Sequence, residues 1–172
     1  MKQARFRAPA RPGPTPTPTP FVLDLIAALG EEAVQWQPER LRAYEYDGSI
    51  DVGHPEAVAL ISRASDASTA LRIAAKHGRP VVPRGSGTGL SGGAVLTRGG
   101  LALTFSKMRG VSSIDAANLR ATVEPGVINL DVSRAVAPHG LYFAPDPSSQ
   151  AACSIGGNIA ENAGGAHCLA YG

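Results

Sequence analysis

A glycine-rich stretch at residues 83–93 carries the clearest chemical signal in the sequence. Five of its eleven residues are glycine, and Arg84, Ser86 and Thr88 lie among them. Glycine lacks a Cβ and accepts positive φ angles, so such a run lets several backbone N–H groups converge on one anion. Each hydrogen bond to a charged group contributes about 1.5–3 kcal/mol, so a few of them would hold a diphosphate. We therefore expect a diphosphate-binding loop, the alternative being a flexible surface turn.

Two common nucleotide-binding motifs are excluded by the surroundings of this stretch. A Walker A loop requires a lysine, and no lysine lies between Lys76 and Lys107. The glycines within residues 87–92 match the Rossmann fingerprint, but that fingerprint opens a helix and is followed by an acidic residue. Only residues 94–98 separate the loop from the next glycine pair, and the strand expected at 101–105 ends without a carboxylate. The Rossmann match is therefore accidental.

A second glycine cluster lies near the end of the chain, at residues 154–165. Gly156 and Gly157 fall at the expected start of a helix, where free N–H groups and the helix dipole favour anions. Gly164 and Gly165 are expected to stop that helix. If the two glycine clusters lie on neighbouring strand ends, they can hold opposite sides of one extended ligand.

The elements that must position these clusters form an α+β pattern. Apolar spacing predicts helices at 21–29, 66–77, 129–138 and 154–163, and strands at 57–61, 80–83, 101–105, 111–115, 119–124 and 141–143. Residues 31–44 indicate a short helix or a turn-rich segment. Asp66 is the expected N-cap of its helix, with Leu71, Ile73 and Ala74 facing inward and Gly78 closing it.

Composition limits the classes of protein to consider. The 172 residues carry a net charge of +2 that comes largely from a basic, proline-rich beginning, which argues against a broad basic face for nucleic acid. Cys153 and Cys168 do not have metal-binding spacing, and they indicate a reducing compartment without a metal site. We expect a disordered tail at 1–20, a helical segment at 21–50, and one domain, itself incomplete, at 51–172.

The residues at 83–93 and 144–165 resemble the FAD-binding domain of the vanillyl-alcohol oxidase, or PCMH-type, family. Within it, the sequence is most similar to the FAD-linked subunit of bacterial glycolate oxidase and to D-lactate dehydrogenases. The similarity covers roughly residues 39–172, including the motifs at 44–48, 123–126 and 137–142. It implies two small α/β subdomains, with this N-terminal fragment ending inside the second.

The resemblance implies that residues 84–92 wrap the pyrophosphate of FAD. It implies that residues 145–153 lie along the flavin and ribityl parts and that residues 156–164 complete the flavin and diphosphate contacts. The implied cofactor-binding residues are Arg84, Gly85, Ser86, Gly87, Thr88, Gly89, Leu90, Gly92, Pro145, Ser149, Cys153, Gly156, Gly157, Asn158, Asn162 and Gly164. In relatives that attach FAD covalently a histidine often stands at the position of Thr88, so noncovalent FAD is expected. A thioether to Cys153 is not expected, since small buried residues are usual there.

The function implied by the resemblance is hydride transfer from a 2-hydroxy acid, such as glycolate or D-lactate, to FAD. Substrate and acid–base residues would lie in a cap domain beyond this sequence, so the catalytic residues stay unknown. Implied partners are an iron–sulfur subunit and a second FAD-domain subunit, in the cytoplasm at the periphery of the inner membrane. The alternative is a truncated, non-catalytic FAD-binding module. A UDP-sugar enolpyruvyl reductase on the same scaffold fits the sequence at 148–157 less well.

The remaining candidates have simpler interpretations. His54, His77 and His139 are expected to be structural, and His167 is the histidine nearest the expected flavin site. Asp146 and Glu161 are expected to cap helices or accept hydrogen bonds. Trp36 is expected in the core or a domain contact.

Overall fold

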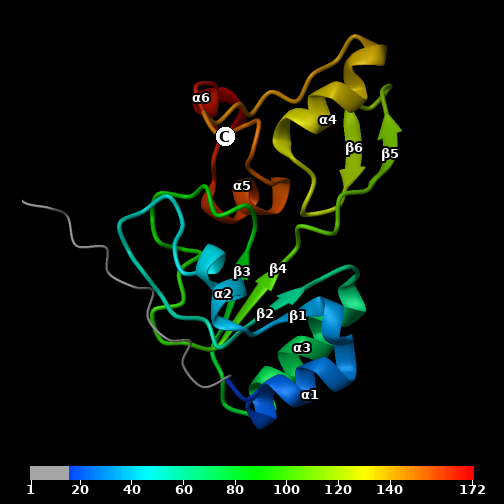
Figure 1. Cartoon of the computed structure of the whole chain (residues 1–172). Coiled ribbons are helices and arrows are strands. Elements are labelled where there is room, and N and C mark those ends of the chain that lie inside the picture. Colours follow the sequence, from blue (N-terminus) through cyan, green and yellow to red (C-terminus); the bar gives the residue numbers. More distant parts are fainter. Residues whose placement is uncertain (1–15) are drawn as a thin grey trace, which may run out of the picture.

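The computed structural model describes residues 16–172 and contains a four-stranded sheet, a separate two-stranded hairpin and surrounding helices (Figure 1). The part of the expected tail at residues 1–15 lies outside the described residues. The helices are α1 (Pro20–Leu29), α2 (Pro38–Leu41), α3 (Ala64–Lys76), α4 (Asn129–Val136), α5 (Ile155–Glu161) and α6 (Cys168–Tyr171), with 3-10 turns at Glu31–Ala33, Arg42–Tyr44 and Ala137–His139. The strands are β1 (Val34–Gln35), β2 (Ala57–Leu60), β3 (Val81–Arg84), β4 (Leu101–Thr104), β5 (Val111–Asp115) and β6 (Arg120–Val123).

The four-stranded sheet has the order β1-β2-β4-β3, with β2, β4 and β3 parallel and β1 antiparallel to β2. Both faces are covered, because alternate residues of β2 and β4 point to different apolar clusters. One cluster joins Ala57, Ala59, Leu101 and Leu103 to α1 and α3. The other joins Val58 and Ala102 to residues such as Leu41 and Leu96 on the opposite face. The short strand β1 was not predicted, since two residues carry no periodicity.

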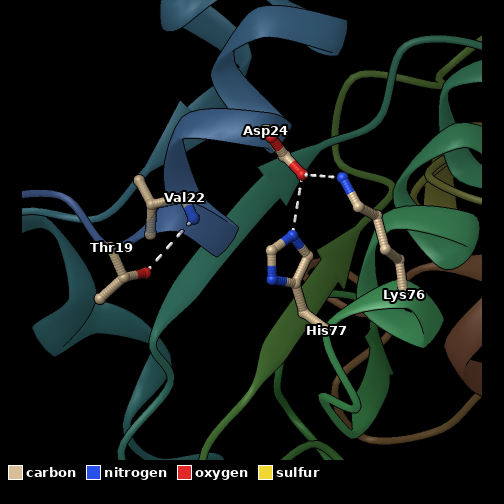
Figure 2. Close-up of polar contacts among 5 residues, drawn as sticks. All are labelled: Thr19, Val22, Asp24, Lys76 and His77. Carbon is tan, nitrogen blue, oxygen red and sulfur yellow. Dashed lines mark hydrogen bonds and ion pairs between the residues drawn. The ribbon is translucent and has the colours of Figure 1, made fainter.

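Helices α1 and α3 pack side by side on one face of the sheet and are joined by a polar cluster (Figure 2). Lys76 Nζ and His77 Nε2 lie 2.7 and 2.8 Å from the same carboxylate oxygen of Asp24. The hydrogen bonds from Lys76 and His77 lower the pKa of Asp24. The predicted helix at 21–29 is confirmed, and Thr19 caps it through a hydrogen bond from the Val22 amide. Trp36 packs against the same core, as expected.

Helix α3 corrects two predictions. Asp66 is not the N-cap: the helix begins at Ala64, and Asp66 lies in its first turn, where its carboxylate accepts a hydrogen bond from Arg63 Nε at 2.8 Å. Leu71 does not face inward, since 48% of it is exposed. The buried stripe consists of Ala70 and Ala74, which are four residues apart, and Leu71 lies about 100° around the helix from Ala70.

Strand β3 is an edge strand that leads directly into the glycine-rich stretch. The carbonyl groups of Pro80 and Arg84 accept hydrogen bonds from Leu101 and Phe105 on the β4 side. Because neighbouring residues of a strand alternate in direction, the backbone nitrogen of Pro83 points to the open edge. The missing N–H of Pro83 therefore costs no bond within the sheet.

The second part of the fold combines the β5–β6 hairpin with α4 and α5 around a small core of Val127, Val132 and Ile155. The hairpin prediction is confirmed. The expected strand at 141–143 is absent from the described residues, because the Phe143 amide bonds to Ser133 Oγ at 2.9 Å instead of to a neighbouring strand. Helix α5 ends at Glu161, earlier than predicted, because Asn162 adopts a left-handed conformation with φ 53°.

Within the part of the chain that the structure describes, no helix is both long and apolar enough to cross a bilayer.

Candidate functional site

A cavity of about 770 Å³ opens at the carboxyl ends of β3 and β4, a position where open α/β sheets commonly bind ligands. One wall is the glycine-rich loop, residues 84–94, and the other is formed by residues 147–163. Figure 1 shows the segment that carries α5 lying over the end of β3. The two glycine clusters therefore face one space, as the sequence predicted.

In the glycine-rich loop one carbonyl group is bonded to the segment behind the loop, whereas the amides have no partners among the described residues. The Gly89 carbonyl accepts a hydrogen bond from the Gly48 amide at 2.8 Å. Among the described residues, none of the N–H groups of residues 85–93 donates a hydrogen bond to the protein. Gly87 and Gly92 have φ angles of 71° and 76°, which a residue with a side chain adopts only under strain. Such a loop offers hydrogen-bond donors without offering a charge.

Arg84 does not extend its charge into the cavity. Its side chain is buried and donates hydrogen bonds to the carbonyl groups of Ala43, Tyr46 and Ala94. Burial lowers the pKa of the guanidinium, and the nearby Asp47 carboxylate opposes that change. The resemblance gave Arg84 as a cofactor-binding residue, and in the structure both of its Nη atoms donate to carbonyl groups of the protein.

Asp47 supports the loop from behind. Its carboxylate is buried and accepts hydrogen bonds from the amides of Ser49 at 2.8 Å and Ala94 at 3.4 Å. Burial acts to raise the pKa of Asp47, but these hydrogen bonds and the charge of Arg84 outweigh it, so the net shift is downward. Residues 43–53 thus form a back wall for the loop. The motif at 44–48 was visible in the sequence, but its contact with residues 84–94 was not.

The N-terminus of α5 forms the opposite wall, and here one expectation is wrong. The first amides of α5 are not free: Ile155 donates to Val127, Gly156 donates to Pro125, and Gly157 donates to Ser154 Oγ. Gly156 is needed for packing, since a Cβ there would lie 2.8 Å from Pro125 Cβ. This seven-residue helix therefore contributes shape rather than a set of anion-binding N–H groups.

Asn158 carries an unpaired donor in this wall. The residue is 9% exposed and lines the cavity, and its buried Nδ2 has no hydrogen-bond partner among the described residues. A buried amide without a partner costs roughly 1–3 kcal/mol, so its presence calls for an acceptor from elsewhere. A ligand in the cavity can supply that acceptor.

Glu161 joins the two walls at the mouth of the cavity. Ser91 Oγ donates a hydrogen bond to Glu161 Oε2 at 2.9 Å. The carboxylate lies against Gly89 and Gly93, where side chains would obstruct it. Its expected role as a hydrogen-bond acceptor is confirmed, although its partner comes from the loop.

Most of the predicted cofactor-binding residues line the cavity. Those that do are Arg84, Gly85, Ser86, Gly87, Thr88, Gly89, Leu90, Ser149, Cys153, Gly156, Gly157 and Asn158. Gly92, Pro145, Asn162 and Gly164 lie beside it rather than in its wall. Residues that the prediction left out and that line the wall include Phe105, Pro125, Pro147, Ser148 and Ser154. Of these, all but Phe105 belong to the motifs at 123–126 and 144–165 that were already conspicuous in the sequence.

The histidines lie away from the cavity wall. His77 contacts Asp24, His54 lies 3.8 Å from Glu45, and His139 is in the 3-10 turn that follows α4. His167 Nδ1 lies 3.0 Å from Asp146 and ties the last residues to the segment before Pro147. The expectation that His77 is structural is confirmed by its place between α1 and α3.

Comparison with known proteins adds an independent finding. A family model described as an FAD binding domain matches residues 55–172. Glycolate oxidase subunit GlcD of Escherichia coli (strain K12) is 50% identical over 78% of this chain, and D-lactate dehydrogenase of Archaeoglobus fulgidus is 39% identical over 76%. The chain spans 27% and 30% of the lengths of these two relatives. The solved structure of p-cresol methylhydroxylase superposes with a TM-score of 0.69 at 23% identity, covering 81% of this chain and 28% of that one.

Proposed function

The chain belongs to the FAD-binding domain family, and from that premise we propose that the cavity binds the diphosphate of FAD on the amides of residues 85–93. The family and the PCMH-type fold agree with the resemblance that residues 83–93 and 144–165 predicted. The single observation that carries the proposal is the set of loop amides without partners among the described residues.

The residues around the cavity fit such a cofactor. The cavity volume is within the range of about 300–1,000 Å³ that is usual for ligand sites. Asn158 lines the same space and its Nδ2 has no partner among the described residues, and acceptor oxygens and nitrogens are plentiful on FAD. Thr88 and the buried Cys153 line the cavity wall. Thr88 stands where relatives that attach FAD covalently often have a histidine, which supports noncovalent binding of FAD.

We propose that the whole protein oxidises a 2-hydroxy acid, for which bound FAD supplies the two-electron redox chemistry. The support is the similarity to a glycolate oxidase subunit and a D-lactate dehydrogenase. In this chain, the loop amides hold the cofactor and the back wall orients the loop. None of the described residues is assigned the acid–base step.

The multi-subunit setting is also a proposal. The name of the glycolate oxidase relative describes a subunit, which supports association with other chains. An iron–sulfur subunit as electron acceptor, a second FAD-domain subunit and a cytoplasmic site at the inner membrane are the finer forms of this proposal. The free cysteines Cys153 and Cys168 suit a reducing compartment.

Flavin retention tests the proposed function. The chain is mixed with FAD, desalted and scanned across the flavin absorbance bands, with riboflavin and ADP in parallel. We expect FAD to be retained, riboflavin to be lost, and excess ADP to displace FAD, because the diphosphate carries the binding. Complete loss of FAD absorbance would overturn the proposal. Anaerobic addition of glycolate or D-lactate then addresses the non-catalytic alternative, since bleaching of retained flavin would exclude it.

A further inference from the structure

We propose that Arg84 is a positioning residue, which orients the amides of residues 85–93 from behind the loop and does not itself bind the diphosphate. The proposal rests on the proposed function for its ligand, and on the contacts of Arg84 for the rest. Under this proposal neutral donors bind the doubly charged group, and Arg84, the one cation that the described residues place in the cavity wall, has a different task.

The guanidinium joins both ends of the loop to the back wall. Nη1 donates to the carbonyl of Ala94 at 3.3 Å, and Nη2 donates to the carbonyl groups of Ala43 and Tyr46 at 3.3 and 2.8 Å. Arg84 is also the last residue of β3, so the loop leaves the sheet and returns to the same side chain ten residues later. The planar fork of arginine suits this role, since one group reaches three carbonyl groups at once.

The loop is built around this side chain. A Cβ on Gly87 would collide with Nη2 and Cζ of Arg84, so the absence of a side chain at Gly87 lets the backbone pass directly over the guanidinium. The ring of Tyr44 lies on the guanidinium, with 5.6 Å between its centroid and Arg84 Cζ. These contacts hold Arg84 between the back wall and the loop.

The electrostatic interaction with the buried Asp47 carboxylate helps to keep the Arg84 side chain in this position. Both Arg84 and Asp47 are 7% exposed, and the charge of each favours the charged form of the other. If Arg84 turned toward a ligand, three carbonyl groups would lose a hydrogen-bond donor, and the buried Asp47 carboxylate would lose a nearby positive charge. A buried polar group left without a partner costs roughly 1–3 kcal/mol.

Hydrogen exchange and FAD affinity of three variants of the full chain test the proposal. Arg84→Met removes the charge, Arg84→Lys keeps it without the fork, and Arg98→Met alters an exposed arginine just beyond the loop as a control. Without ligand, we expect exchange of the Gly48 and Ala94 amides, whose hydrogen bonds join the loop to the back wall, to accelerate by roughly tenfold or more in both Arg84 variants. Exchange in α1 and α3 should stay unchanged, FAD affinity should fall similarly in both variants, and the control should match the wild type.

The opposite pattern would show that Arg84 binds the diphosphate. In that case ligand-free exchange of the Gly48 and Ala94 amides stays unchanged in Arg84→Met, and Arg84→Lys restores FAD affinity. A measurement on the wild type covers the case in which the variants fail to fold. We expect the NMR signals of the Arg84 guanidinium to move far less than the amide signals of residues 85–93 on addition of FAD, and an equal movement would overturn the proposal. If the proposed function is wrong, the wild type does not bind FAD. The exchange result for the ligand-free variants does not depend on that outcome.

Discussion

The Gly48 amide donates a hydrogen bond to the Gly89 carbonyl at 2.8 Å, and this bond fastens the middle of the glycine-rich loop to its back wall. A Cβ on Gly48 would lie 2.8 Å from the same carbonyl oxygen, so the two backbones approach too closely for any side chain. The bond turns one carbonyl of the loop away from the cavity while the loop amides remain available.

Substitution of Gly48 by alanine should therefore damage both stability and binding. We expect Gly48→Ala to lower the free energy of unfolding by about 1–3 kcal/mol, because backbone rather than a flexible side chain obstructs the new methyl group. FAD affinity should fall as well. Chemical denaturation and flavin fluorescence measure the two effects. Gly110→Ala is the matched control, since its closest neighbour is the flexible carboxylate of Glu124; equal losses in both variants would contradict the assignment.

Substitution of the two buried asparagines, Asn129 and Asn158, should have different effects on the stability of the ligand-free protein. Asn129 Nδ2 donates to the Pro145 carbonyl at 3.1 Å, whereas Asn158 Nδ2 has no partner in the described chain. We expect Asn129→Ala to lower the free energy of unfolding by about 1–3 kcal/mol, and Asn158→Leu to leave the ligand-free protein equally stable or more stable. FAD affinity should fall roughly tenfold in Asn158→Leu. Unchanged FAD affinity in that variant would remove Asn158 from the cofactor site.

The charge of Glu161 should oppose FAD binding while its hydrogen bond assists it. Glu161→Gln removes the charge and keeps an acceptor for Ser91, so FAD affinity should rise by about two- to fivefold at low salt. Ser91→Ala breaks the bond across the mouth and should weaken binding slightly. FAD titrations at low and high salt separate the effect of the Glu161 charge from that of its hydrogen bond, because salt screens only the charge. A Glu161→Gln variant that binds as weakly as Glu161→Ala would show that the charge itself is required.

The cluster of Asp24, Lys76 and His77 should make stability depend on pH. The pKa of Asp24 is lowered in the folded protein, so this carboxylate stabilises the fold above its ordinary pKa near 3.8, and the contribution is lost as the pH falls through the lower folded value. We expect Asp24→Asn to melt slightly below the wild type at neutral pH, with the difference vanishing in acid. Thermal melts from pH 7 down to pH 3 measure this. A difference that grows on acidification would contradict the assignment.

Much of the sheet could be predicted from the sequence because its strands are short apolar runs bounded by turn residues. The runs at 57–61 and 101–105 and the hairpin at 111–124 each carry a local signal. The order of the strands in the sheet has no local signal, since strand pairing depends on residues far apart in the chain. The expected strand at 141–143 failed for a related reason: an apolar run becomes a strand only where a neighbouring backbone is available.

The glycines of the candidate site could be predicted from the sequence, but the contacts of its charged side chains could not. Closely spaced glycines at residues 85–93 have few explanations other than close backbone approach, so the loop was recognisable. Arg84 looked like a cation for the ligand because burial cannot be read from one position. The three carbonyl groups that it contacts belong to residues with no local feature that marks them as acceptors. The hydrogen bonds of the Ile155 and Gly156 amides were equally hard to predict, since their acceptors, Val127 and Pro125, lie about thirty residues earlier in the chain.

The position of Pro83 has a consequence for self-association. Among the described residues, strand β3 has a neighbouring strand on one side only, and such an edge is a place where a strand of a second molecule can add. Proline offers no donor on that side, so strand addition beside the cofactor loop is blocked at the residue just before Arg84. The same residue that delivers the chain to the loop thus protects the molecule from aggregating through this edge.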